Sequence, residues 1–155
     1  MRRSVLKRLQ PVLPALGFAA AFAGAVYAQA LESLSIATQG SQKQSFRVEV
    51  ARNDADRAQG LMYRRSMPAD QGMLFDFGRV EPVSMWMQNT YLSLDMLFIR
   101  PDGTIARIAP NTEPLSTRTI PSGEPVLAVL ELNAGTASKL GIKPGDRVEH
   151  PIFKR

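Results

Sequence analysis

The six residues from Met85 to Thr90, Met-Trp-Met-Gln-Asn-Thr, have side chains suited to binding a small molecule. They include the single tryptophan of the chain, flanked by two thioethers and followed by two amides and a hydroxyl. An aromatic ring allows stacking and amides form hydrogen bonds without net charge, which would suit a sugar ring or another small neutral ligand. The alternative is a core strand that leaves through a turn bonded to its own backbone. The candidate ligand-binding residues of this stretch are Trp86, Gln88, Asn89 and Thr90.

Methionine is the second residue type with chemistry of its own. Thioethers bind Cu(I), and the alternation of a strand would put Met85 and Met87 on one face with Trp86 on the other. Against copper, methionine commonly fills small cores, and the only histidine, His150, lies far along the chain. We favour core filling and expect no cofactor; the copper candidates are Met85 and Met87.

Two carboxylates and two arginines stand among apolar neighbours. Asp95 follows Leu94, and Glu131 lies between two leucines. A carboxylate in such surroundings faces an open sheet surface or pairs with a cation. At a suitable separation, Asp95 and Glu131 would be the acid and base of a glycan hydrolase, which makes them the catalytic candidates. We favour ion pairs with arginine that fix a helix in place, and we also take Arg57 and Arg64 as candidate ligand-binding residues.

The N-terminus has the three parts of a secretory signal peptide. A basic head precedes an apolar stretch over about residues 12–26, and small residues follow that fit cleavage after Ala28 or Ala30. The stretch is short for a membrane anchor and contains proline and glycine, so cleavage is favoured. We predict a signal peptide over residues 1–28 and a periplasmic or secreted protein with no transmembrane span after cleavage.

Composition excludes several classes of function. The chain has 19 basic and 14 acidic side chains, and the predicted signal contains four of the basic ones, so 15 against 14 remain. No basic field for nucleic acid is left. Without cysteine there is no disulfide, lipid-modified cysteine or thiol nucleophile, and any zinc site or catalytic triad would depend on His150. The expected partner is a small neutral ligand or an envelope component.

The remaining chain suits one domain. We predict a flexible N-terminal segment over 29–43, with a loosely held first strand as the alternative, and then a single mainly β domain over 44–155. Apolar runs and period-two alternation predict strands at 45–50, 72–77, 83–87, 94–99, 104–108, 126–132 and 147–149. Six or seven short strands with two short helices indicate a compact sandwich or barrel-like domain.

Local signals place the connections. Asn53 or Asp54 caps a helix that reaches Met62, and Gly141 ends a second helix over 135–140. Residues 101–103, Pro-Asp-Gly, make a hairpin of the strands on either side, and residues 78–82 form a turn. Residues 109–125 include four prolines and predict a long loop that would cover a pocket beside Trp86.

A series of motifs is typical of one family. The motifs are Arg57-x-x-Gly60-Leu61-Met62-x-Arg64, Gly72-Met73-x-Phe75-x-Phe77, Trp86-Met87-x-Asn89-Thr90 with Leu94-Asp95, Pro121-Ser122-Gly123, Leu130-Glu131, Gly135-Thr136-Ala137, Gly141 and Gly145-Asp146. They cover nearly all of residues 46–149, in order, and closely resemble the domain of unknown function 192 family. The resemblance implies a small, mainly β, sandwich-like domain that is commonly exported, and no established activity. Position 88 is glutamine where many members have a basic residue, so no anionic ligand is expected on that side chain.

The sequence therefore predicts a non-catalytic binding or accessory protein of the cell envelope with its pocket at Trp86–Thr90. The first alternative is an envelope hydrolase that works through Asp95 and Glu131. The second is Cu(I) binding by methionine.

Overall fold

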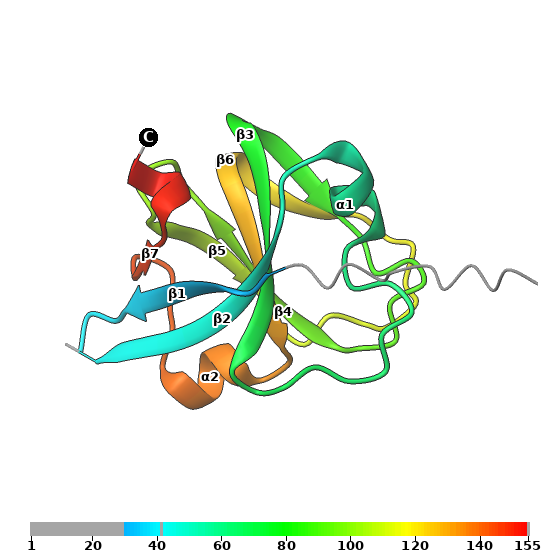
Figure 1. Ribbon diagram of the computed structural model, residues 1–155, viewed down its shortest axis with the longest axis horizontal. Coiled ribbons are helices and arrows are strands. Elements are labelled where there is room, and N and C mark those ends of the chain that lie inside the picture. The colour runs from blue at the N-terminus through cyan, green and yellow to red at the C-terminus, as the bar shows by residue number, and fades with distance from the viewer. Residues whose placement is uncertain (1–29, 41, 155) are drawn as a thin grey trace, which may run out of the picture.

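Seven strands form one continuous sheet in the computed structural model, which describes residues 30–40 and 42–154. The predicted signal peptide lies outside the described residues. Along the sheet the strand order is β5-β4-β6-β3-β2-β1-β7 (Figure 1). The strands are β1 (Glu32–Ala37), β2 (Lys43–Ala51), β3 (Gln71–Met85), β4 (Leu94–Ile99), β5 (Ile105–Ala109), β6 (Ile120–Asn133) and β7 (Arg147–Glu149). The helices are α1 (Asp54–Gln59), α2 (Thr136–Leu140) and the 3-10 helix η1 (Pro151–Lys154).

Strands β3 and β6 are the two longest and form the centre of the sheet. They pair antiparallel from Gly72 opposite Leu132 to Met85 opposite Ile120. The turn predicted over 78–82 is wrong, because β3 runs through it and shifts its register there instead. Such bulges bend a strand without ending it. The long loop predicted over 109–125 is too long at its C-terminal end. Strand β6 already begins at Ile120, where it pairs with β3.

The two edges of the sheet meet at one end, so the sheet curls into a half-barrel. Thr104, just before β5, bridges Arg147 of β7. Backbone hydrogen bonds join Ile105 N–H to the Asp146 carbonyl (2.9 Å) and Val148 N–H to the Gly103 carbonyl (2.8 Å). Edge strands that pair in this way leave fewer free donors and acceptors for other chains. The predicted mainly β class with six or seven strands and two short helices is confirmed, although the strands predicted at 72–77 and 83–87 are both parts of β3 and the seventh strand is β1.

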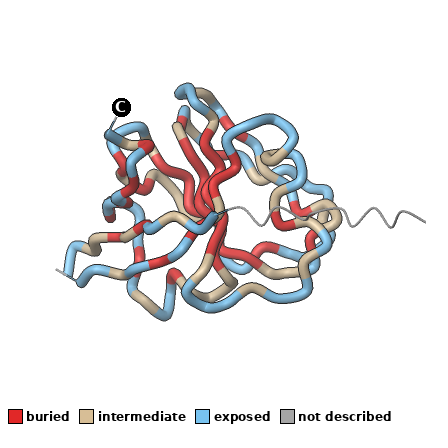
Figure 2. The backbone as a smooth tube through the Cα atoms, in the orientation of Figure 1, coloured by how far each residue is buried: buried red, intermediate tan, exposed pale blue. Residues whose placement is uncertain are grey.

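Apolar side chains fill both faces of the central strands. Figure 2 shows the buried residues gathered along the middle of the sheet. The first core draws on all seven strands and includes Leu34, Ile36, Leu74, Leu97 and Leu130. The second core lies on the opposite face and includes Leu61, Met73, Phe75, Met87, Met96 and Phe98. Because both faces of the sheet are covered, every residue of β4 is buried.

Most of the local predictions agree with the structure, but the first helix ends at Gln59, with Gly60 at φ 47° as its cap, and does not reach Met62. The Asn53 side chain caps α1 by accepting the Asp56 N–H at 2.8 Å, and Gly141, with φ 68°, ends α2. Strands β4 and β5 form the predicted hairpin. The N-terminal segment predicted to be flexible contains β1, because Leu34 and Ile36 alternate with polar residues and are buried between β2 and β7.

Neither α-helix in the described part of the chain has the length or the apolar run that crossing a bilayer demands.

The closure of the half-barrel gives a first prediction. Gly103 and Gly78 both have positive φ, 86° and 70°, but a Cβ at Gly103 would lie 2.5 Å from the Val148 carbonyl oxygen, whereas one at Gly78 would meet nothing within 4 Å. Gly78→Ala should lower the free energy of unfolding by about 1–2 kcal/mol through backbone strain alone. Gly103→Ala should lower the free energy of unfolding by about 1–3 kcal/mol more than Gly78→Ala, because the added Cβ overpacks the closure. Urea unfolding of both variants measures the difference. Equal losses would contradict a tight closure.

Candidate functional site

Three loops, one of them the turn that follows β3, are joined to one another. Strand β3 ends at Met85, so Trp86 lies just beyond it, and residues 88–89 turn the chain. Backbone hydrogen bonds run from Tyr63 N–H to the Asn89 carbonyl (2.9 Å) and from Leu115 N–H to the Thr90 carbonyl (3.0 Å). Met87 N–H donates to the Ser116 carbonyl at 3.0 Å. The segments around residues 63, 89 and 115 are thus held together by their backbones.

The same three loops adopt unusual backbone angles. Tyr63, Asn89 and Leu115 have φ of 64°, 56° and 63°. This left-handed region is rare for residues other than glycine, and for bulky residues such as tyrosine and leucine it is strained. Strained residues of this kind concentrate at functional sites, where the surrounding structure holds them in place.

Large apolar side chains around this turn face solvent. Tyr63 is 58% exposed, Trp86 49%, Tyr91 43% and Leu115 54%. Arg65 lies over the Tyr91 ring at 5.2 Å from its centroid. Single exposed apolar residues are ordinary, but four of them on loops joined to one turn indicate a contact surface.

A cavity of about 270 Å³ opens beside Trp86. The second core provides one wall, since Phe75 and Phe77 come from β3, and α1 with the turn after it provides another. The lining residues are Arg57, Ala58, Gln59, Gly60, Leu61, Met62, Phe75, Phe77, Ser84, Met85, Trp86, Thr90 and Glu131. Small-ligand sites are of this kind, mainly apolar with a few polar groups.

Glu131 is the polar group that distinguishes this cavity. It is 4% exposed and lies opposite Met73 of β3 and Met96 of β4, so its side chain faces the second core. No hydrogen bond or ion pair reaches its carboxyl from any residue in the described ranges. Burial alone raises the pKa of Glu131 to about 8, because a charged carboxylate is poorly solvated there. A buried ionisable group without a partner in a cavity is a mark of a functional site.

Arg57 borders the cavity but is occupied by other partners. Its Nη1 donates to the carbonyls of Arg52 and Asp76, each at 2.8 Å. Its Nη2 pairs with the exposed Asp54, and the guanidinium lies 5.6 Å from the centroid of the Phe77 ring. Arg57 thus holds the end of α1 against β3 through a backbone carbonyl. The predicted ion pairs of arginine with Asp95 and Glu131 are wrong, since Arg57 pairs with Asp54 and Arg64 with Glu49.

Three candidates of the ligand-binding set, Gln88, Asn89 and Arg64, lie outside the cavity lining. Arg64 makes a two-pronged ion pair with Glu49 of β2, and the pKa of Arg64 is raised mainly by that hydrogen-bonded pairing. The Asn89 amide points to the Met62 sulfur at 3.9 Å. Of the predicted residues, Trp86, Thr90, Arg57 and the carboxylate candidate Glu131 line the cavity, whereas Gln88, Asn89 and Arg64 do not.

Asp95 has a structural environment. It is fully buried, and its Oδ1 accepts the N–H groups of Asn111 (2.9 Å) and Gly135 (3.1 Å) while Oδ2 accepts that of Ala137 (2.9 Å). It therefore ties the start of α2 to β4. Asp95 lies opposite Leu132 and the neighbouring Met96 opposite Glu131, so the two carboxylates face opposite sides of the sheet. The hypothesis that Asp95 and Glu131 act as an acid–base pair is wrong for this reason.

The two copper candidates separate where the strand ends. Met85 lines the cavity beside Trp86, whereas Met87 is fully buried and lines a different cavity of about 460 Å³ under residues 107–121. The Met87 sulfur accepts a hydrogen bond from Thr112 at 3.2 Å. The shared face expected of Met85 and Met87 is not formed, because strand alternation stops at residue 85.

The predicted loop does not cover the Trp86 cavity. Residues 107–121 line the second cavity, and none of them lines the first. Residues that the sequence reasoning missed are Phe75 and Phe77, whose spacing of two puts both on one strand face, and the α1 residues Ala58 and Gln59. The Phe-x-Phe alternation was the signal that could have identified this wall.

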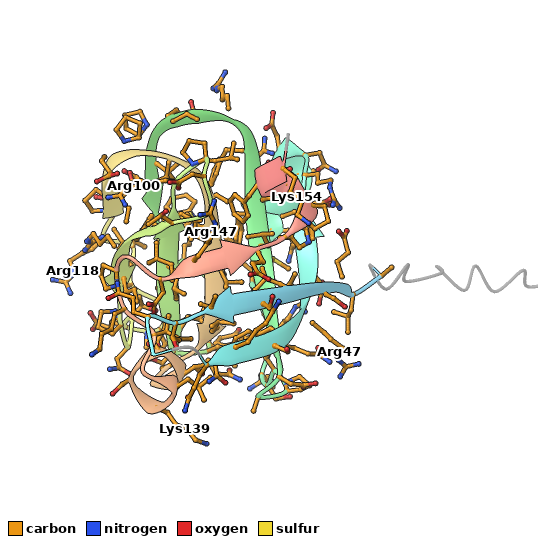
Figure 3. The ribbon with its side chains drawn as sticks, turned by 90° about the vertical axis from the view of Figure 1, so that its left-hand side faces the viewer. Arg47, Arg100, Arg118, Lys139, Arg147 and Lys154 are labelled. Carbon is orange, nitrogen blue, oxygen red and sulfur yellow. The ribbon has the colours of Figure 1, made fainter. Side chains whose placement is uncertain are left out.

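Basic side chains are dispersed over the surface. Figure 3 shows Arg47, Arg118 and Lys139 at separate edges of the molecule. Arg47 pairs with Asp70 and Arg118 with Glu113. Among the residues that the structure describes, no group of three histidine, aspartate or glutamate side chains is arranged to hold a metal ion.

These features define a small single-domain protein with one curled sheet and a mainly apolar cavity at the end of its central strand. The domain of unknown function 192 family, described as an uncharacterized family, matches residues 35–150. The chain belongs to this family.

Two solved structures are similar to the chain over most of its length. A Sinorhizobium meliloti 1021 protein, provisionally named a transcription regulator, is 55% identical with a TM-score of 0.77 and covers 78% of this chain and 94% of its own. A Novosphingobium aromaticivorans DSM 12444 protein of unknown function is 36% identical with a TM-score of 0.77 and covers 81% and 89%. No curated protein matches the chain.

The environment of Asp95 gives a prediction about stability. Asp95→Asn replaces one acceptor oxygen by an NH2 group that faces a backbone N–H, so the free energy of unfolding should fall by about 2–4 kcal/mol in urea. Asp70→Asn is the matched control, since Asp70 is exposed and pairs with the exposed Arg47, and it should change stability by less than about 1 kcal/mol. Similar small losses for both would contradict a structural Asp95.

The buried Glu131 gives a prediction about pH. Folding favours its neutral form, so its contribution to stability is fully present below pH 4.5, its ordinary pKa, and is lost as the pH rises through about 8. Relative to Glu131→Gln, the wild type should lose up to about 4 kcal/mol across this range in urea unfolding at several pH values. A stability difference that does not change with pH would show that Glu131 is solvated.

Proposed function

We propose that this protein is a non-catalytic binding protein that takes a small ligand into the cavity beside Trp86. The observation that supports it is the combination of a half-exposed tryptophan with an unpaired buried carboxyl in one mainly apolar cavity. Apolar walls with one or a few polar groups give affinity by desolvation and orientation by the polar group. The strained turn that holds Trp86 adds a rigid edge to this site.

Binding without catalysis is favoured because the cavity lacks a pair of catalytic groups. Asp95 faces the other side of the sheet, and the Thr90 hydroxyl donates to the Gln88 carbonyl at 3.2 Å. His150 does not line the cavity; its Nε2 lies 3.3 Å from Glu32 without the geometry of a hydrogen bond, and burial lowers its pKa. General acid–base chemistry needs a second group within reach of the first.

We also propose that the protein works in the cell envelope after export. The basic head, the apolar stretch and the small residues that follow at the N-terminus support this assignment. The name of the Sinorhizobium meliloti protein would suggest nucleic-acid contacts for this chain as well. We do not propose a nucleic-acid-binding role, because the 15 basic and 14 acidic side chains beyond residue 28 nearly cancel and leave no positive field to attract a polyanion.

The test is a titration of Trp86 fluorescence in a protein of residues 29–155. Trp86 is the single tryptophan, so a saturable change on adding small aromatic compounds, amines or sugars reports on this cavity. Ala58→Phe narrows the mouth, because Ala58 is exposed and lines the cavity, and it should weaken binding at least about tenfold.

Ala55→Phe is the matched control, since Ala55 is exposed on the same helix outside the cavity lining and should leave binding unchanged. Equal weakening by both variants would mean that the ligand does not enter the cavity. A signal that no compound changes would overturn the proposed site.

A further inference from the structure

The polar lining of the Trp86 cavity contains a carboxyl in addition to the uncharged groups of Gln59, Ser84 and Thr90. Gln88 and Asn89 are not part of the lining, and Glu131 is. Its carboxyl lies between methionines of β3 and β4, and within the described residues it receives no hydrogen bond or ion pair. A charge buried without a partner is costly, so a ligand that supplies the opposite charge has much to gain here.

The walls around this carboxyl are of the type that accepts organic cations. Three aromatic residues, Phe75, Phe77 and Trp86, line the cavity together with the thioether side chains of Met62 and Met85. Aromatic faces attract a desolvated cation, and quaternary ammonium groups are bound in this way. Aliphatic substituents of the same ligand would contact the methionines.

Within the described residues no protein cation pairs with the Glu131 carboxyl, although Arg57 lies over the Phe77 ring at 5.6 Å from its centroid. Arg57 is the other charged residue of the lining, and its guanidinium is held by Asp54 and by the carbonyls of Arg52 and Asp76. Glu131 has burial as the sole cause of its altered acidity, with no contribution from Arg57. The charge of Arg57 is therefore balanced locally, while the charge of an ionised Glu131 would not be.

We propose that the cavity binds a small organic ammonium ion, with the Glu131 carboxylate as its counter-ion and the aromatic rings around its apolar groups. This inference rests on the proposed binding function and names the chemical class of the ligand. A cavity of about 270 Å³ limits the ligand to a few carbon atoms beyond the ammonium group.

Binding of this class of ligand would release a proton. In the free protein Glu131 is mostly neutral at pH 7, since its pKa is about 8. The cation pairs with the ionised form, so its affinity should rise by about fiftyfold between pH 6 and pH 8. A neutral ligand that accepts a hydrogen bond from the protonated carboxyl would bind more weakly as the pH rises, which is the opposite trend.

The experiment compares choline with its neutral isostere 3,3-dimethyl-1-butanol, in which a carbon replaces the ammonium nitrogen. Both are titrated into residues 29–155 by Trp86 fluorescence and calorimetry at pH 6, 7 and 8. At pH 8 we expect choline to bind at least about tenfold more tightly than the isostere. The affinity for choline should rise with pH, while the affinity for the isostere should show no such rise. Glu131→Gln should abolish the preference for choline and its pH dependence, and Glu113→Gln, at an exposed position outside the cavity, should change neither.

Each outcome bears on one proposal. Equal binding of choline and the isostere, or a preference that Glu131→Gln retains, would overturn the ammonium proposal and leave the binding function standing. No binding of choline at any pH would also overturn it, and the wider titration with Ala58→Phe then decides the binding function separately. Unfolding curves for Glu131→Gln at pH 6 establish that the variant is folded, so that its loss of choline binding refers to the cavity.

Discussion

The antiparallel pairing of β3 with β6 is the interaction on which the rest of the structure depends. These strands lie at the centre of the sheet, and their side chains extend into both cores. The ladder reaches Met85, which fixes where Trp86 emerges, and it sets Glu131 opposite Met73. Both ends of the candidate site thus belong to one continuous hydrogen-bonded pair, and the register shifts between them allow β3 to bend without interruption.

The candidate site opposes the stability that this pairing provides. An apolar side chain at position 131 would avoid the electrostatic cost of burying the Glu131 carboxyl. The left-handed backbone angles at Tyr63 and Leu115 strain the loops beside Trp86. Asp95 of the adjacent strand β4 shows the contrast, since it is also buried but accepts three backbone N–H groups. Two carboxylates with similar sequence surroundings are thus opposite in character, one satisfied and structural, the other unpaired and open to a ligand.

Sequence patterns predicted elements that depend on neighbouring residues alone. The cap at Asn53, the end of α2 at Gly141 and the hairpin of β4 and β5 follow from side-chain and backbone preferences over a few residues. Patterns failed where distant strands decide the outcome. Glycine and proline at 78–82 suggested a turn, and prolines near 121 suggested a loop, but pairing between β3 and β6 over long sequence separation made strands of both.

By itself the sequence determined the family, the mainly β class and four of the residues that meet at the cavity, Arg57, Trp86, Thr90 and Glu131, because residue type and order carry that information. Only the tertiary structure decided which of the candidates share a cavity. The face that a side chain takes depends on register and on the residue at which a strand ends. That is why Asp95 and Met87 point away from the site, and why Glu131, without a partner, became its defining group.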